Sequence, residues 1–311
     1  MLLTLLSSLV RAEPGALEAD APVPELPPRE IVDLGAIPPD IAQIARSVGH
    51  LPLPDRMARI SEAMLGKPYV SDPLGEGQGI DPDPIARYDA FDCLTFTEEV
   101  LALSLAGDPV QAAQIRRDLR YGPENTIAYV NRRHFMELQW IPGVVRDGWL
   151  RNTTAEYGDV ILLEKEITDQ TWNTWRPRKR FAHKDDELPK GMMRLEVLPL
   201  ATAREVAGKI RPGSVILTVR SDRPTVPIWV THVSLVVPGP NGKAVLRHAT
   251  KIGKGGTRDH GVDWYLGHLE SYTNWKVVGI SILEPVEPLV RSVPNPATDA
   301  SASTEGADRT P

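Results

Sequence analysis

The chain has 311 residues, 41% of them hydrophobic, which is enough for one large folded domain or two small ones. It carries 35 basic and 41 acidic residues and has no long basic run. Nucleic-acid-binding proteins need a concentrated Lys/Arg surface to neutralise phosphates, so this composition argues against that class. The one basic cluster, RPRKR at 176–180, is followed almost at once by KDDE and is interpreted as a solvated loop.

The N-terminus begins MLLTLLSSLVRAEPG, a short apolar run that ends in Val10-Arg11-Ala12. This ending is typical of a signal-peptidase site, so residues 1–12 are predicted to be a signal peptide and the protein to be exported, periplasmic or extracellular. A hydrophobic N-terminal strand or helix is the alternative. Because the run is too short to cross a bilayer and no later segment reaches the ~20 apolar residues required, no integral membrane segment is expected.

Two low-complexity segments flank the part of the chain that is expected to fold. Residues 13–40 hold seven prolines and few aromatic residues, which predicts an extended leader or linker. Residues 285–311 have the same character and are predicted to be a disordered tail. Residues 41–284 are therefore expected to form one domain.

The most strongly predicted helix is CLTFTEEVLALSLA (93–106), with PDRMARISEAML (54–65) before it. Apolar residues cover most of the circumference of the segment that begins at Cys93, so this helix is expected to be central and buried. Asp92 occupies the N-cap position, where its carboxylate can accept from first-turn amides, and Gly107 ends the helix.

In the C-terminal half the pattern changes to β-branched residues punctuated by Gly and Pro. The expected strands are 158–167, 194–200, 213–219, 229–237 and 243–250, with a short helix at 201–210. Helices followed by a run of antiparallel strands predict an α+β fold.

Cys93 is the only cysteine, so it has no partner within the chain for a disulfide. A cysteine nucleophile works as a thiolate and needs a base. The helix start favours negative charge, which is expected to lower the pKa of the Cys93 thiol. The base should be a histidine.

Two of the seven histidines, His232 and His248, lie on consecutive predicted strands joined by PGPNG (238–242). If those five residues form the loop, Val237 faces Lys243 and the two histidines lie directly opposite each other on one face. A two-residue turn would move them out of opposition and put prolines into the ladder, so the five-residue loop is favoured. Such a pair suits a base and the group that orients it.

A metal site is the competing explanation for one cysteine and two histidines. The sequence has no CxxC, HxxxH or HxH spacing to support it, so no metal and no other cofactor is expected.

Five segments occur in a characteristic order: GKPYVSDPLGEGQ (66–78), YDAFDCLTFTEEVLAL (88–103), YVNRRHFMELQWI (129–141), THVSLVV (231–237) and RHAT (247–250). Together they resemble the NlpC/P60 superfamily of papain-like cell-wall hydrolases, and more closely its DUF1460 branch, the N-acetylmuramoyl-L-alanine amidase-like proteins. The resemblance covers roughly residues 57–284.

The resemblance implies a papain-like fold with the nucleophile at the N-terminus of a buried helix packed on an antiparallel sheet. It makes Cys93 the nucleophile and His232 the general base, and gives His248 the place of the residue that orients the base. Tyr69 matches a tyrosine that lines the substrate cleft, and Asp92 matches the acid before the nucleophile.

The chain departs from the family pattern at two positions: Leu94 stands where Ser or Thr is usual, and Ser234 replaces a Gly. Arg133 and His134 are candidates to line the cleft and bind a carboxylate-rich stem peptide. Local structural hydrogen bonding is the alternative for both.

The implied function is an exported cysteine amidohydrolase, N-acetylmuramoyl-L-alanine amidase-like, that acts on peptidoglycan or muropeptides through a thioester. Two alternatives remain open. One is a γ-D-glutamyl-diamino-acid endopeptidase, which cuts within the stem peptide, and the other is a non-catalytic peptidoglycan-binding protein on the same fold.

Overall fold

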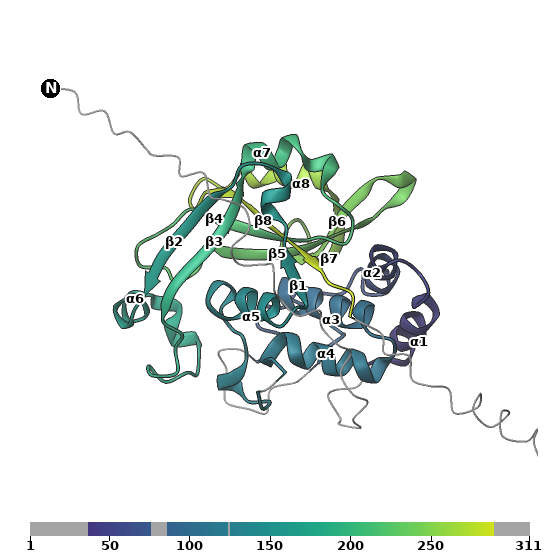
Figure 1. Cartoon of the computed structure of the whole chain (residues 1–311), viewed down its shortest axis with the longest axis horizontal. Helices are drawn as coiled ribbons and strands as arrows, with labels where there is room; N and C mark the ends of the chain where they lie inside the picture. The colour runs from purple at the N-terminus through teal and green to yellow at the C-terminus, as the bar shows by residue number, and fades with distance from the viewer. Residues whose placement is uncertain (1–36, 76–85, 124, 289–311) are drawn as a thin grey trace, which may run out of the picture.

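Helices cover both faces of one antiparallel sheet in the computed structural model, which describes residues 37–75, 86–123 and 125–288 (Figure 1). Helices α1 to α5 lie on one side of the sheet, and α7 and α8 lie on the other. A mixed fold built on an antiparallel sheet is what the sequence predicted. The proposed signal peptide (1–12), most of the Pro-rich leader and residues 289–311 of the tail lie outside the described residues.

The first helices, α1 (Pro39–Val48) and α2 (Leu53–Glu62), each have a proline in the first turn. Proline is well tolerated there because its missing N–H would have no intrahelical partner. The predicted leader boundary at residue 40 is therefore wrong by two residues: Pro39 and Asp40 already belong to α1. Helix α2 ends before the predicted residue 65, although Met64 is fully buried.

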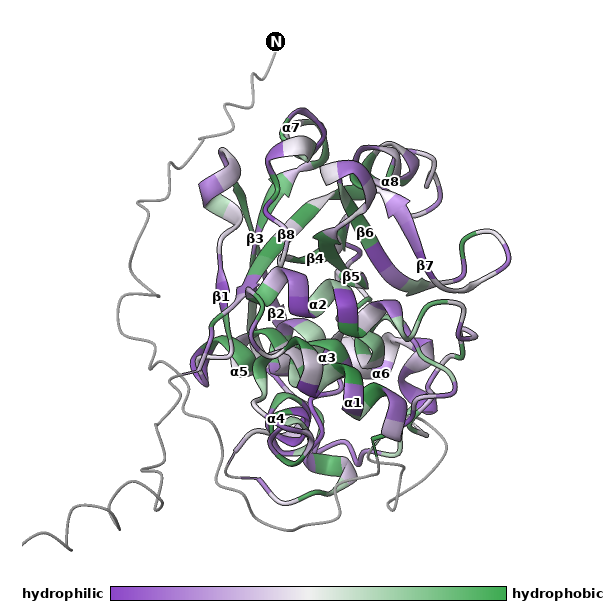
Figure 2. Ribbon diagram, turned by 90° about the vertical axis from the view of Figure 1, so that its right-hand side faces the viewer, coloured by the Kyte–Doolittle hydropathy of each residue, from purple (hydrophilic) through white to green (hydrophobic). Residues whose placement is uncertain are grey.

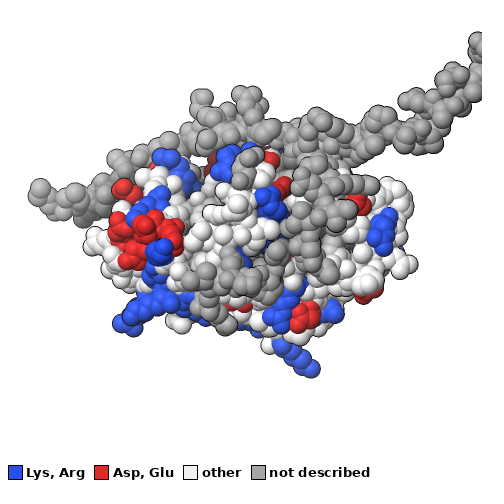
Figure 3. Space-filling view, turned by 90° about the horizontal axis from the view of Figure 1, so that it is seen from below, with Lys and Arg blue, Asp and Glu red and all other residues white. Residues whose placement is uncertain are grey.

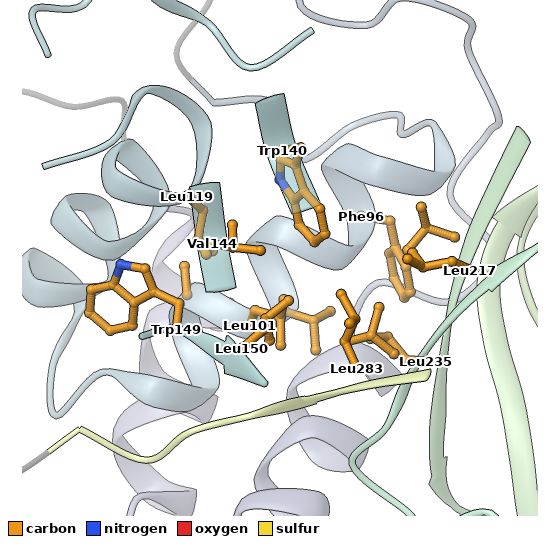
Figure 4. Packing of buried hydrophobic residues seen from close by; sticks show 14 of the residues in the cluster. Phe96, Leu101, Leu119, Trp140, Val144, Trp149, Leu150, Leu217, Leu235 and Leu283 are labelled. Carbon is orange, nitrogen blue, oxygen red and sulfur yellow. The ribbon is translucent and has the colours of Figure 1, made fainter. Parts of the chain in front are cut away.

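Helix α3 (Cys93–Leu105) is the central helix, as predicted, and α4 (Pro109–Tyr121) packs beside it. All α3 residues from Thr95 to Leu105 are buried. Figure 4 shows its apolar side chains, among them Phe96 and Leu101, in one cluster with Leu235 and Leu283 of the sheet. Burial of a side chain of this size stabilises the fold by roughly 1.5–3 kcal/mol.

The sheet has eight strands in the described residues, in the order β2-β3-β8-β4-β5-β6-β7, with β1 paired to β8. The central strand β8 is largely apolar and the edge strand β7 is polar (Figure 2). The strands are β1 (Leu150–Asn152), β2 (Ile161–Ile167), β3 (Gly191–Pro199), β4 (Val215–Arg220), β5 (Val230–Pro238), β6 (Ala244–Thr250), β7 (Gly256–Gly261) and β8 (Val277–Pro285).

The remaining helices are short. They are α5 (Ile141–Arg146), α6 (Asp169–Thr174), α7 (Leu200–Glu205), α8 (Val262–Leu269) and a π-helix (Met136–Trp140). The predicted helix at 201–210 is α7 followed by a separate 3-10 turn.

The C-terminal domain boundary also needs a correction. Strand β8 includes Pro285, and the backbone N–H of Val286 donates to the carbonyl of Trp149 (3.0 Å). The first two residues of the predicted tail are therefore part of the folded domain.

The β5–β6 hairpin has a five-residue connection, Gly239–Lys243, one residue later than predicted. Val237 pairs with Val245 and not with Lys243, so the predicted register is wrong by two residues. Asn241 and Gly242 adopt positive φ values, which let the chain turn between the strands. A shift of two preserves the alternation of faces, and His232 and His248 stay on one side of the sheet as diagonal neighbours.

On the face seen in Figure 3, Lys and Arg side chains stand among Asp, Glu and uncharged residues and do not form one continuous basic surface. Within the described ranges, no helix combines the length and apolar character needed to span a membrane.

Candidate active site

The site is built around the N-terminus of α3, where Cys93 is a free, half-buried thiol. Asp92 caps the helix as predicted: its carboxylate accepts from the backbone N–H and the hydroxyl of Thr95, both at 2.8 Å. The Thr95 hydroxyl in turn accepts from the Asp92 N–H (3.1 Å), which completes a capping box. These bonds fix the backbone at the start of α3 and with it the position of Cys93. The Asp92 carboxylate therefore acts as the N-cap of this helix.

Tyr69 lies next to Cys93 because the chain around it runs alongside Phe91. The N–H of Val70 donates to the Phe91 carbonyl, and the N–H of Phe91 donates to the Pro68 carbonyl, both at 3.0 Å. Burial raises the pKa of the Tyr69 phenol, and negative charge on Cys93 and Asp92 raises it further. The structure thus places Tyr69 near the thiol.

His232 on β5 and His248 on β6 are joined by a contact of 2.7 Å between Nε2 of His232 and Nδ1 of His248. His248 is fully buried and His232 is half-buried. Since Nε2 of His232 is occupied by this contact, its Nδ1 is the nitrogen left for another partner.

Helix α3 packs on β5, which brings the Cys93 thiol to the backbone of the strand that carries His232. The backbone N–H of Val233, the residue after His232, acts on the Cys93 sulfur together with the N–H groups of Cys93 and Leu94. All three favour the thiolate, but burial and the Asp92 carboxylate outweigh them and raise the pKa of Cys93 to about 12. The helix start therefore acts in the expected direction, but the net pKa of this thiol is raised and not lowered, because desolvation is the larger effect.

Burial, with the positive charges of Arg220 and His260, lowers the pKa of His232 to about 4. The pKa of His248 is lowered well below its usual value, mainly by burial. At pH 7 the resting site therefore holds a neutral thiol and neutral imidazoles. Such a site can transfer a proton from sulfur to nitrogen when a substrate carbonyl is attacked.

A model of the AmiA-like family, described as N-acetylmuramoyl-L-alanine amidase-like, matches residues 59–259. The match covers more than half of the chain and includes Cys93, His232 and His248. The chain belongs to this AmiA-like family. No curated protein matches it.

Solved structures similar to this AmiA-like chain share its fold at low sequence identity. A Legionella pneumophila protein assigned to DUF1460 is 21% identical, with a TM-score of 0.66 over 80% of this chain and 95% of its own. An N-acetylmuramoyl-L-alanine amidase from Bacteroides uniformis is 21% identical, with a TM-score of 0.61 over 75% and 99%. A Bacteroides fragilis protein named as a candidate xylanase is 21% identical, with a TM-score of 0.57 over 72% and 98%.

Two residues near the histidines of the AmiA-like chain were given no role by the sequence. Tyr265 of α8 is buried, donates to or accepts from the Thr218 hydroxyl (2.8 Å), and lies edge-on to His248 with ring centroids 5.4 Å apart. His260 of β7 contacts the second nitrogen of His248, Nε2, through its own Nδ1 at 2.9 Å. Residues TRDHG (257–261) have no apolar alternation, so no strand was predicted there.

Arg133 and His134, the candidates for the substrate cleft, both have internal partners, and Arg133 also lines a small cavity with Asp92 and Leu94. The Arg133 guanidinium is buried, pairs with the Asp147 carboxylate, and donates to the Leu119 carbonyl. His134 Nε2 contacts the Tyr129 carbonyl at 2.7 Å, and burial lowers the pKa of His134 to about 3.

Behind the start of α3 lies a buried network of opposite charges. Glu98 accepts from Arg120 (2.6 Å) and from the indole N–H of Trp140 (2.9 Å). Glu99 accepts from Arg116 (3.1 Å) and Arg120 (3.0 Å). We call Glu98, Glu99, Arg116 and Arg120 the charge network. It fixes α3 against α4 and thereby the position of Cys93.

Proposed function

We propose that this AmiA-like chain is a cysteine amidohydrolase that cleaves the amide bond between N-acetylmuramic acid and L-alanine in peptidoglycan or muropeptides. The observation that carries the proposal is the contact between His232 and His248 on strands that pack against α3, the helix that begins with the Cys93 thiol. Membership in an N-acetylmuramoyl-L-alanine amidase-like family supports the choice of bond. We assign the chain to the papain-like NlpC/P60 superfamily on the same grounds.

In the acylation step, Sγ of Cys93 attacks the carbonyl carbon of the scissile amide while Nδ1 of His232 takes the thiol proton. The tetrahedral oxyanion is stabilised by backbone N–H groups at the start of α3, including that of Cys93. The carbon–nitrogen bond then breaks, and the imidazolium gives its proton to the leaving amine. A thioester remains on Cys93.

In the deacylation step, His232 takes a proton from water, the hydroxide attacks the thioester, and the thiolate leaves and is reprotonated. His248 orients the His232 ring throughout, as the third member of the triad. Tyr69 lines the cleft next to the sulfur. None of these steps calls for a metal or an organic cofactor.

The proposed substrate implies a cellular location for the protein. Peptidoglycan lies outside the cytoplasmic membrane, so the proposed activity requires export to the periplasm or the cell exterior. The apolar run at residues 1–12 supports this localisation.

The test is mass spectrometry of the products formed from purified muropeptides. The wild type should release free stem peptide and a sugar without peptide, whereas the Cys93→Ala variant should release neither. The matched control is Ser104→Ala at the other end of α3, a buried position where the substitution also removes one heavy atom. This control should keep wild-type activity.

Other products would change the assignment. A sugar that retains L-Ala-D-Glu would identify the endopeptidase, with the same chemistry at another amide. Absence of cleavage by a folded wild-type protein would overturn the amidase proposal and favour a binding role.

A further inference from the structure

Nε2 of His248 contacts Nδ1 of His260, a residue outside the proposed triad. We infer that His260 is a positioning residue, which fixes the tautomer of His248 and through it the tautomer of His232. This inference rests on the proposed function, since it concerns how the base of that reaction is prepared. We call His232, His248 and His260 the histidine relay.

The relay crosses three adjacent strands of the sheet. His248 lies on β6 between the other two members, with Nδ1 2.7 Å from Nε2 of His232 and Nε2 2.9 Å from Nδ1 of His260. In the β6–β7 ladder His260 is paired with Leu246 and is therefore a diagonal neighbour of His248. The rings of His248 and His260 are nearly perpendicular, at 82°, with centroids 5.1 Å apart.

Each of these two contacts joins two ring nitrogens and holds one hydrogen, so one ring must donate and the other accept. When the three rings are neutral, this leaves two arrangements of the whole relay. In the first, His232 and His248 both donate from Nε2, and His260 accepts at Nδ1. In the second, every bond is reversed, and His260 donates from Nδ1.

Only the first arrangement gives His232 a lone pair on Nδ1, the nitrogen that must take the proton of Cys93. In the second, His232 accepts at Nε2 and carries its hydrogen on Nδ1, so it cannot act as a base toward the thiol. His260 therefore selects the working arrangement by presenting an acceptor, not a donor, to His248. In a serine-protease triad, the carboxylate that accepts from the catalytic histidine has the corresponding role.

The surroundings of His260 suit this acceptor role. Its ring stacks on Trp264 of α8, with centroids 4.6 Å apart and an interplanar angle of 15°. Trp264 also stacks on His268 of the same helix, with ring centroids 5.1 Å apart and an interplanar angle of 5°. The stack holds the ring plane of His260, so Nδ1 keeps facing His248.

Four ionisable groups act on His260: His248 from β6, Arg258 and Asp259 from β7, and His268 from α8. Burial lowers the pKa of His260, as do the charges of Arg258 and His268, and Asp259 opposes them. The neutral form is therefore favoured, and only the neutral form has a lone pair for His248.

The test compares His260→Leu with His260→Asn in the full chain. Asn and Leu have nearly the same shape, but only Asn has an acceptor oxygen, which is attached to Cγ as Nδ1 is in histidine. We expect His260→Leu to lower kcat on muropeptides by about 10- to 100-fold at nearly constant KM, as loss of an outer partner does in other sites. His260→Asn should stay within about 3-fold of the wild type.

The same variants are examined by nitrogen-15 NMR of the imidazole rings, which reports the tautomers directly and needs no substrate. The wild type should show His232 and His248 with hydrogen on Nε2. His260→Leu should shift His248 toward the Nδ1–H form, and His260→Asn should not. The control is His268→Leu, which removes a ring from the stack but no relay nitrogen, and it should leave the tautomers unchanged.

Two results would overturn the inference: unchanged tautomers in His260→Leu, or an equal loss of kcat in the Asn and Leu variants. His260 is half-buried on an edge strand, so both variants are expected to fold. If the wild type cleaves no muropeptide but the tautomers respond to the Leu variant as predicted, the positioning role stands and the proposed substrate falls.

Discussion

Two sets of polar side chains lie in the interior near the start of α3, the charge network and the histidine relay. They differ in how their polar atoms are paired. The charge network joins opposite charges: Glu98 and Glu99 accept from Arg116 and Arg120 at 2.6–3.1 Å. The histidine relay joins only imidazoles, and burial lowers the pKa of each of its members.

The difference shows what each set can do. A buried ion pair is held in its charged state, because neutralising or removing one partner leaves the other charge without compensation. Such a pair fixes geometry and exchanges no proton. Neutral buried imidazoles keep their lone pairs, so they can accept a proton during a reaction. The network should therefore matter for stability and the relay for activity.

The largest expected effect is on turnover. His232→Gln removes the proposed base, and we expect kcat on muropeptides to fall by about 10⁴-fold, the order seen when a triad loses its working histidine or tautomer. Because the network is intact in this variant, its urea midpoint should stay close to that of the wild type. A large loss of stability with little loss of kcat would reverse the assignment of the two sets.

The next effect is on stability. Arg120→Met leaves Glu98 and Glu99 with one fewer cation in a buried site, and the free energy of unfolding should fall by about 3–5 kcal/mol. Urea denaturation measures this. The control is Arg59→Met, which breaks an exposed pair with Glu62 and should cost less than about 1 kcal/mol. Equal losses in the two variants would contradict the comparison.

The pH dependence of stability should identify the relay. The pKa of His232 is about 4 in the folded protein, below its usual value of 6.5, so the unfolded chain binds more protons between these values. The contribution of His232 is therefore fully present above pH 6.5 and is lost as the pH falls toward 4. Unfolding free energies at pH 7, 6 and 5 should fall less steeply in His232→Gln than in the wild type. Equal slopes would show that His232 is not held neutral.

The smallest expected effect concerns Glu137, a buried carboxyl that accepts from the backbone N–H groups of Trp229 and Val230 at the start of β5. Burial raises its pKa to about 7, so its contribution is present below pH 4.5 and is lost as the pH rises through 7. Glu137→Gln keeps an acceptor oxygen and should change stability at pH 5 by less than about 1 kcal/mol.

The stabilities of the wild type and the Glu137→Gln variant should diverge as the pH rises. Above pH 7 the Glu137→Gln variant should become the more stable, because it has no carboxyl to ionise in the interior. Urea midpoints at pH 5 and pH 8.5 measure the difference. A constant difference between them would show that the Glu137 carboxyl ionises at its ordinary pKa.

Local signals in the sequence were sufficient for the centre of the site. The capped start of α3 and the placement of His232 and His248 on one face follow from N-cap chemistry and strand alternation. The predicted register was wrong by two residues, because the loop between β5 and β6 spans Gly239–Lys243 and not the predicted residues 238–242. Because the shift is even, His232 and His248 still lie on the same face of the sheet.

The parts that could not be predicted depend on distant partners. Strand β8 inserts between β3 and β4, although it follows them by many residues, and β7 is too polar to have an apolar alternation. The burial of Glu98 and Glu99 on α3 is explained by distant partners, chiefly the arginines of α4. His260 was left without a role because its strand was not predicted.

We propose above that Cys93 forms a thioester with the sugar end of the substrate, and the intact mass of protein quenched with acid during turnover of a muropeptide would detect this thioester. We expect a transient mass increase equal to the muramoyl-containing acyl group, located on the peptide that holds Cys93, the only cysteine. Cleavage of the muropeptide by Cys93→Ala, or an adduct on a different residue, would contradict it.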